Sequence, residues 1–132
     1  MKFILIFLLL LTQVSCVNRN TVHFESEFDP HKVKNIYIEK DIDDNSNLDE
    51  AYIAMLNNIG INTKLNQNDV NVDAVLTYKA KWVNSSKPII YTMYTKLKHP
   101  VTGFPLAYVQ VTHTTPIMPI DFVSESLFLL FK

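Results

Sequence analysis

An apolar stripe along residues 48–59 is the clearest structural signal in the chain. Its members recur every three or four residues, which is the period of an α-helix with one buried face. Asn47 and Glu50 resemble a capping box at the start, and Gly60 suits a left-handed cap at the end. The pattern therefore predicts an amphipathic helix. The stripe consists of Leu48, Ala51, Tyr52, Met55, Leu56 and Ile59.

Segments on both sides of this helix have the period-two pattern of strands. Before it, Ile36 and Ile38 share one face of residues 33–40, and the helix is followed directly by a short strand over residues 61–65. A strand, a helix and a second strand with a short return form a right-handed crossover if the two strands are parallel neighbours. We therefore expect this unit to begin the sheet.

Three longer alternating segments follow, at residues 74–83, 89–98 and 106–112, and predict an antiparallel meander. A four-residue loop after Val83 would pair Tyr78 with Met93, and the next turn would pair Leu97 with Ala107. Both pairings bring apolar faces together, as a buried sheet face requires. The opposite face would carry polar side chains: Thr77, Lys79, Lys81, Thr92, Tyr94, Lys96, Lys98, Tyr108 and Gln110.

The end of the chain returns to a helical period. Ile120, Val123, Leu127 and Leu130 form a stripe that Phe122 and Phe128 widen, so this helix must be buried or must meet a partner. The whole pattern predicts an α+β fold. We expect a two-layer sandwich with a five-stranded mixed sheet, built from a strand-helix-strand unit and an antiparallel meander, with two helices on one face.

The first sixteen residues have the pattern of an export signal. Lys2 precedes an unbroken apolar run at residues 3–11, and nine helical residues rise only about 14 Å, too little to cross a hydrocarbon core of about 30 Å. Val14 and Ser15 then lead to Cys16. This ending resembles bacterial lipoprotein signals, which implies cleavage between Ser15 and Cys16 and lipidation of Cys16. The alternative is an ordinary cleaved signal peptide in which Cys16 has no role in processing.

The domain organisation follows from this signal. Residues 1–15 would form the signal peptide, residues 16–32 a lipidated tether entering an edge strand, and residues 33–132 a single α+β domain. About 117 mature residues suffice for one hydrophobic core but not for two domains. Within the tether, residues 21–25 alternate weakly and form one possible strand, and Asp29 and Pro30 end it.

Composition excludes several kinds of site. The net charge of −1 does not indicate the basic surface of a nucleic-acid-binding protein. Cys16 is the single cysteine, so neither an intrachain disulfide nor a cysteine-based zinc site is available. Residues 41–52 begin like a calcium loop, but Ser46 replaces the required glycine and Tyr52 the bidentate glutamate.

Catalytic motifs are also missing. The chain has two glycines and no glycine-rich phosphate loop, and Ser124 and Ser126 lie without a glycine elbow. His113 has no sequence neighbours that suggest a triad. We therefore expect no enzymatic activity, no cofactor and no metal.

Three segments resemble a family of small uncharacterised bacterial envelope lipoproteins: residues 33–39, residues 58–63, and Val75–Tyr78 before Trp82. The order of elements is more distantly similar to accessory lipoproteins of the outer membrane that have a helix-backed sheet. The resemblance implies an accessory role, bound to protein or envelope, at the periplasmic face of the outer membrane. Val17, where some lipoproteins have aspartate, resembles the pattern for transit to that membrane.

Two functional hypotheses follow. The first is a membrane-anchored periplasmic lipoprotein that acts as an accessory protein-binding module of a cell-envelope complex. The second is binding or sensing of an anionic envelope ligand by the outer sheet face. The alternative interpretation of this face is an ordinary solvated surface that its lysines keep soluble. The ligand-binding residues would be Lys79, Lys81, Tyr94, Lys96, Lys98 and Tyr108.

Overall fold

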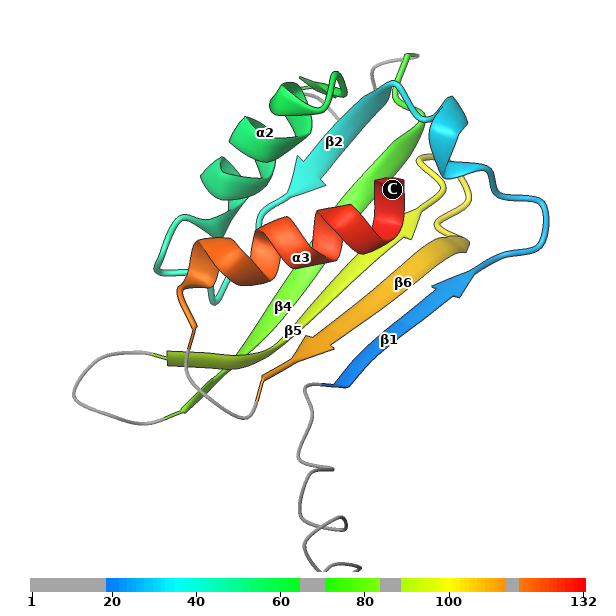
Figure 1. Ribbon diagram of the computed structural model, residues 1–132. Coiled ribbons are helices and arrows are strands. Elements are labelled where there is room, and N and C mark those ends of the chain that lie inside the picture. The colour runs from blue at the N-terminus through cyan, green and yellow to red at the C-terminus, as the bar shows by residue number, and fades with distance from the viewer. Residues whose placement is uncertain (1–18, 65–70, 84–88, 114–116) are drawn as a thin grey trace, which may run out of the picture.

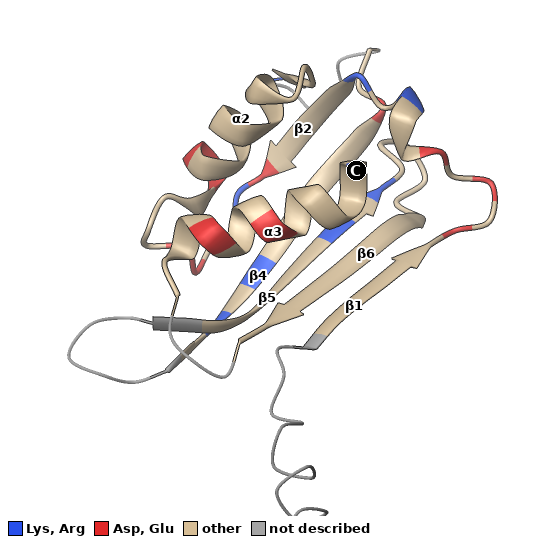
Figure 2. Ribbon diagram, viewed as in Figure 1, with Lys and Arg blue, Asp and Glu red and all other residues tan. Residues whose placement is uncertain are grey.

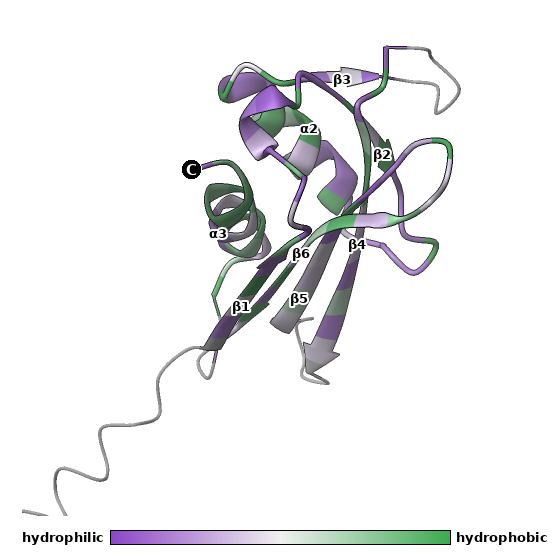
Figure 3. Cartoon of the chain, turned by 90° about the vertical axis from the view of Figure 1, so that its right-hand side faces the viewer, coloured by the Kyte–Doolittle hydropathy of each residue, from purple (hydrophilic) through white to green (hydrophobic). Residues whose placement is uncertain are grey.

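The computed structural model describes residues 19–64, 71–83, 89–113 and 117–132. One six-stranded mixed sheet carries two α-helices on a single face (Figures 1 and 3). The α+β class is therefore confirmed, whereas the prediction of five strands is wrong. The elements are β1 (Arg19–Phe24), η2 (Pro30–Lys32), β2 (Asn35–Glu39), α2 (Leu48–Asn58), β3 (Asn62–Lys64), β4 (Ala74–Val83), β5 (Ile89–Lys98), β6 (Pro105–Thr112) and α3 (Pro119–Phe131).

The strand missing from the predicted five-stranded sheet is β1, which lies within the expected tether, where the weak alternation of residues 21–25 indicated a possible edge strand. It pairs antiparallel with β6, from Arg19 opposite Thr112 to Phe24 opposite Ala107, and forms one edge of the sheet order β1-β6-β5-β4-β2-β3. Both Val22 and Phe24 are 37% exposed, so the apolar side of β1 is only partly buried, which fits the weak alternation of apolar and polar residues in its sequence. This segment is a strand because it pairs with the edge of β6, and that pairing is a tertiary contact.

Asp44, rather than the predicted capping box, supports the start of α2. The carboxylate accepts hydrogen bonds from the backbone N–H groups of Leu48 at 2.8 Å and Ser46 at 2.9 Å. Asn47 makes no side-chain capping bond and has a left-handed backbone with φ of 54°. The prediction of a capping box is therefore wrong. Gly60 has the left-handed backbone predicted for it after the helix end, with φ of 87°.

The strand-helix-strand unit forms as predicted. β2 and β3 are parallel neighbours, with Asn35 opposite Asn62, and α2 connects them. β2 also pairs in parallel with β4, so it lies between β3 and the meander.

The meander is confirmed, but one predicted register is off by two residues. Tyr78 lies opposite Thr95 and not Met93. The hairpin pairs Val83 with Ile89, which shifts the register by one residue, and a β-bulge beside Lys81 and Trp82 shifts it by a second. Since strand side chains alternate with period two, the two shifts together leave the core faces aligned. Leu97 lies opposite Ala107, as predicted.

Both helices pack on the same face of the sheet. α3 buries Phe122, Val123, Ser126, Leu127 and Leu130. α2 buries Leu48, Tyr52 and Leu56 against the same core. The predicted outer face of the meander is left uncovered by the helices, on the far side of the sheet (Figure 3).

Candidate functional site

The predicted ligand-binding residues lie together on the outer sheet face, on β4, β5 and β6. The rings of Tyr94 and Tyr108 are 6.2 Å apart between centroids, and the Lys81 ammonium lies 5.6 Å from the centre of the Tyr94 ring. A shallow hollow of about 650 Å³ covers this area. Among its lining residues are Lys79, Lys81, Tyr94, Lys96 and Tyr108.

Lys98 is the predicted member that differs from the others. Its ammonium donates a hydrogen bond of 3.0 Å to the Glu39 carboxylate on β2, so its charge is already paired. Among the described residues, no ion pair involves Lys79, Lys81 or Lys96. The lysines form blue bands along β4 and β5 in Figure 2. These three lysines therefore have no carboxylate partner in the described part of the chain, although Glu39 and Asp41 also line the hollow.

The tyrosines alter the ionisation of this face. Hydrogen bonding with the Tyr94 hydroxyl, and its charge when ionised, raise the pKa of Lys81, with a smaller contribution from Tyr91. Burial raises the pKa of the Tyr108 hydroxyl, and the neighbouring Tyr94 adds to this effect. Lys81 thus stays protonated and the Tyr108 hydroxyl stays a neutral hydrogen-bonding group near pH 7.

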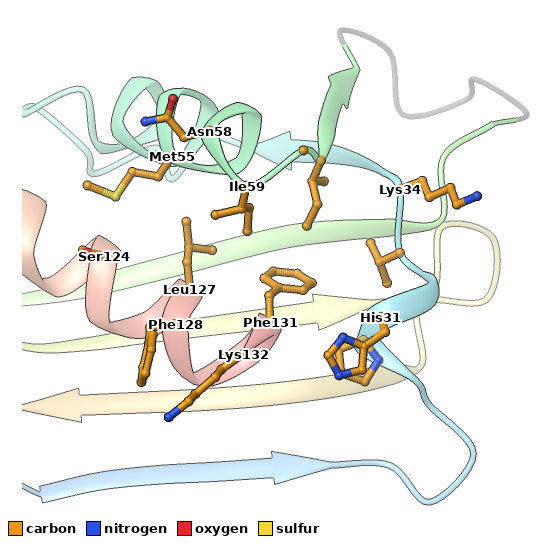
Figure 4. Close-up of a pocket in the computed structure, with 14 residues that line it drawn as sticks. His31, Lys34, Met55, Asn58, Ile59, Ser124, Leu127, Phe128, Phe131 and Lys132 are labelled. Atoms are coloured by element: carbon orange, nitrogen blue, oxygen red, sulfur yellow. The ribbon is translucent and has the colours of Figure 1, made fainter.

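A groove of about 700 Å³ lies on the opposite face of the molecule, between the C-terminal halves of α2 and α3 and the short helix η2 (Figure 4). Most of its lining is apolar. Ile59 is 53% exposed and Phe128 is 55% exposed, so two large apolar side chains of this groove face solvent. Its ionisable lining residues are His31, Lys34 and Lys132.

A buried polar cluster beneath the helices was not predicted. The Tyr78 hydroxyl donates a 2.6 Å hydrogen bond to Asp44, and the Tyr52 hydroxyl lies 2.6 Å from the Thr95 hydroxyl. Burial alone would raise the pKa of Asp44, but hydrogen bonds from Tyr78 and from backbone N–H groups hold it below its usual value. Burial, and then Asp44, raise the pKa of Tyr78. These groups satisfy one another and serve the fold.

His113 joins a second polar group. Its Nε2 atom lies 2.6 Å from Glu125 Oε2, and the Asn20 amide donates a 3.0 Å hydrogen bond to Glu125 Oε1. Of the hydrogen bonds between described residues, none joins His113 to a serine, threonine or cysteine side chain. This group therefore links β1, the end of β6 and α3, and its described members, Asn20, His113 and Glu125, include no nucleophile. No sequence spacing indicated it, because Asn20 and Glu125 are 105 positions apart.

Other candidate sites are limited. Within the described ranges, no group of three or more His, Cys, Asp or Glu side chains could hold a metal ion. No helix in the same ranges is long and apolar enough to span a membrane. Ser15 and Cys16, the predicted cleavage and lipidation residues, lie outside the described residues.

Solved structures share this fold at low sequence identity. A point variant of the PelC dodecamer from Paraburkholderia phytofirmans matches with a TM-score of 0.60 and 11% identity, covering 87% of this chain and 98% of that one. A second PelC dodecamer from the same organism matches with a TM-score of 0.57 and 13% identity, over 86% and 99% of the two chains.

A DUF4136 family protein from Bacteroides thetaiotaomicron also matches, with a TM-score of 0.58 and 8% identity, over 84% of this chain and 94% of the other. No protein-family model and no curated protein matches the sequence. These likenesses show the fold, and they are consistent with a small uncharacterised bacterial family.

Proposed function

We propose that this protein is a lipid-anchored envelope protein that acts as an accessory protein-binding module. In this proposal the chain is cleaved between Ser15 and Cys16, is acylated at Cys16, and works at the periplasmic face of the outer membrane. The export signal and its terminal cysteine support the location. The proposed role involves binding and not catalysis.

The observation that carries the binding role is the groove between α2 and α3. Exposed apolar side chains grouped in one depression favour a protein contact, since scattered ones are ordinary on surfaces. The ionisable side chains among its described lining residues are His31, Lys34 and Lys132, and none of these described residues is acidic. The matching occupant is an apolar segment of an envelope protein that carries acidic side chains. PelC, which shares the fold, is a dodecamer, and this supports protein contact as a use of the fold.

Crosslinking in intact cells, followed by mild extraction and purification, tests this role. Replacing both Ile59 and Phe128 by serine should abolish recovery of the partner. Val101→Ser is the matched control, because Val101 is 87% exposed and does not line the groove. Recovery of the same protein with both variants would contradict the docking surface, and recovery of this chain alone would identify a second copy as the occupant.

Fatty-acid labelling tests the anchor separately. Wild-type protein should incorporate a clickable fatty-acid analogue and remain with membranes, whereas Cys16→Ser should do neither. Unlabelled wild-type protein in the soluble fraction would refute the anchor, whatever the crosslinking shows.

Binding of an anionic envelope ligand on the outer sheet face is the second candidate. It is favoured by the hollow that gathers Lys79, Lys81 and Lys96 without ion-pair partners among the described residues. Glutamine at these three positions should weaken retention on an anionic glycan or lipopolysaccharide column, and salt should weaken wild-type retention because exposed charges are screened over about 10 Å at 0.1 M. Lys32→Gln, which lies outside this hollow, is the control. Equal retention of the triple variant and the wild type would eliminate this candidate.

A further inference from the structure

The position of β1 constrains how an anchored protein would lie on its membrane. β1 begins at Arg19, three residues after Cys16, and three extended residues span at most about 11 Å. This step rests on the proposed lipidation of Cys16. The end of the sheet at which β1 begins must then lie within about 11 Å of the lipid headgroups.

Strand register shows which residues share that end. Arg19 lies opposite Thr112, Thr112 opposite Thr92, and Thr92 opposite Lys81, so these residues form one row across four strands. Beyond the row, β4 and β5 remain paired to Val83 and Ile89. Two further residues extend a strand by about 7 Å. The paired ends of β4 and β5 therefore extend past this row toward the anchor's membrane.

The described side chains at the base of this hairpin suit a lipid–water interface. Tyr91 is 38% exposed and Trp82 is partly exposed. The register passes from Thr92 to Ile90, so Tyr91 is the extra residue of the β-bulge, and bulges redirect side chains out of the regular alternation. Trp and Tyr favour the headgroup level because their rings are apolar and carry one polar group.

The beginning of α3 adds to this surface. α3 starts near the hairpin end of the sheet (Figures 1 and 3), with Met118 66% exposed and Ile120 49% exposed. Lys81, one residue before Trp82, is exposed and supplies a cation for anionic headgroups.

The other end of the sheet also exposes apolar residues, and it serves as a comparison. Val101 and Phe104 are 87% and 70% exposed in the turn between β5 and β6. β5 runs from Thr92 to Lys98 between the two ends, about 20 Å of strand. A chain held at Cys16 cannot bring that turn to the same membrane while the hairpin lies on it.

We propose that the base of the β4–β5 hairpin, with Trp82 and Tyr91, and the beginning of α3 lie in the headgroup region of the membrane that holds the Cys16 acyl chains. The surface partner is a phospholipid bilayer. This contact orients the domain, and it leaves the groove between the C-terminal halves of α2 and α3 facing away from the bilayer, open to a protein partner.

The single tryptophan of the chain, Trp82, makes the contact measurable without a label. The full-length product is purified from membranes, inserted into phosphatidylethanolamine–phosphatidylglycerol vesicles, and compared in vesicles with and without brominated acyl chains. We expect bromine to reduce Trp82 emission by roughly half, as for a ring at the interface. A double variant with Trp82→Phe and Phe104→Trp moves the reporter to the far turn and should show no such loss.

The outcomes separate this inference from the proposed anchor. Protein that carries lipid and floats with the vesicles, but whose Trp82 emission is unchanged by bromine, would overturn the inference and leave the anchor intact. Equal quenching at positions 82 and 104 would overturn the orientation. Protein that lacks the acyl group by mass spectrometry and does not float would overturn both.

Discussion

Replacement of Asp44 by alanine should destabilise the domain strongly, although the residue lies in a loop. Asp44 is 7% exposed, and its carboxylate accepts hydrogen bonds from the backbone N–H groups of Ser46 and Leu48 and from the Tyr78 hydroxyl. It therefore joins the start of α2 to the core face of β4.

The expected magnitude follows from these contacts. Loss of the N-terminal support of a helix costs about 1 kcal/mol. Loss of a hydrogen bond to a charged group costs about 1.5–3 kcal/mol, and the Tyr78 hydroxyl is left buried. Asp44→Ala should therefore lower the free energy of unfolding by about 2.5–4 kcal/mol, which is a large share of the 5–15 kcal/mol typical of a domain.

Urea unfolding at pH 7, followed by far-UV circular dichroism, measures this change on soluble protein carrying Cys16→Ser. Asp43→Ala is the matched control, because the Asp43 side chain is exposed and should change stability by less than about 0.5 kcal/mol. Tyr78→Phe should cost less than Asp44→Ala, and the double variant should cost less than the sum of the two. Equal effects at positions 43 and 44 would show that general charge near the helix start, and not this buried cluster, supports α2.

Three further predictions concern Asp44 and two other polar contacts of the fold. Because hydrogen bonds hold the pKa of Asp44 below its ordinary 3.8, the stability advantage of wild type over Asp44→Asn should be full above about pH 4 and decline as the pH falls through the lowered folded-state pKa; a gap that stays constant down to pH 2 in urea titrations would refute this. Tyr52→Phe leaves the buried Thr95 hydroxyl without its 2.6 Å partner and should cost about 1–2 kcal/mol in urea unfolding, whereas Tyr37→Phe, at a half-buried position, should cost little; equal costs would contradict the buried pair. Glu125→Ala removes the acceptor shared by His113 and Asn20 and should speed amide hydrogen exchange in β1 by roughly five-fold, equivalent to about 1 kcal/mol, while exposed Asp121→Ala should not; unchanged protection of β1 would mean that pairing with β6 alone holds this edge.

The meander shows why local patterns predicted a face more reliably than a register. Alternation along β4 and β5 identifies the buried side of each strand, because that side is repeated at every second residue. The bulge at Tyr91 and the hairpin pairing of Val83 with Ile89 leave no mark in this alternation. The sequence pattern therefore did not predict these two register shifts. Because together they amount to two residues, the predicted buried faces of the strands are still correct.

The start of α2 shows a second limit. Asn47 and Glu50 have the spacing of a capping box, yet Asn47 makes no capping bond. Asp44 supports the helix because the Tyr78 hydroxyl, 34 positions away, also holds its carboxylate. A local motif competes here with a tertiary contact, and the contact decides the geometry.

Periodicity in the sequence alone determined the α+β class, the two helices, the crossover and the buried side of each meander strand, since each depends on neighbours within a few residues. It also placed Lys79, Lys81, Tyr94, Lys96 and Tyr108 on one outer face. Only the tertiary structure decided the sixth strand, the groove and the His113–Glu125 pair. These features depend on what distant segments offer one another: the free edge of β6 for β1, and the space that α2 and α3 leave between them.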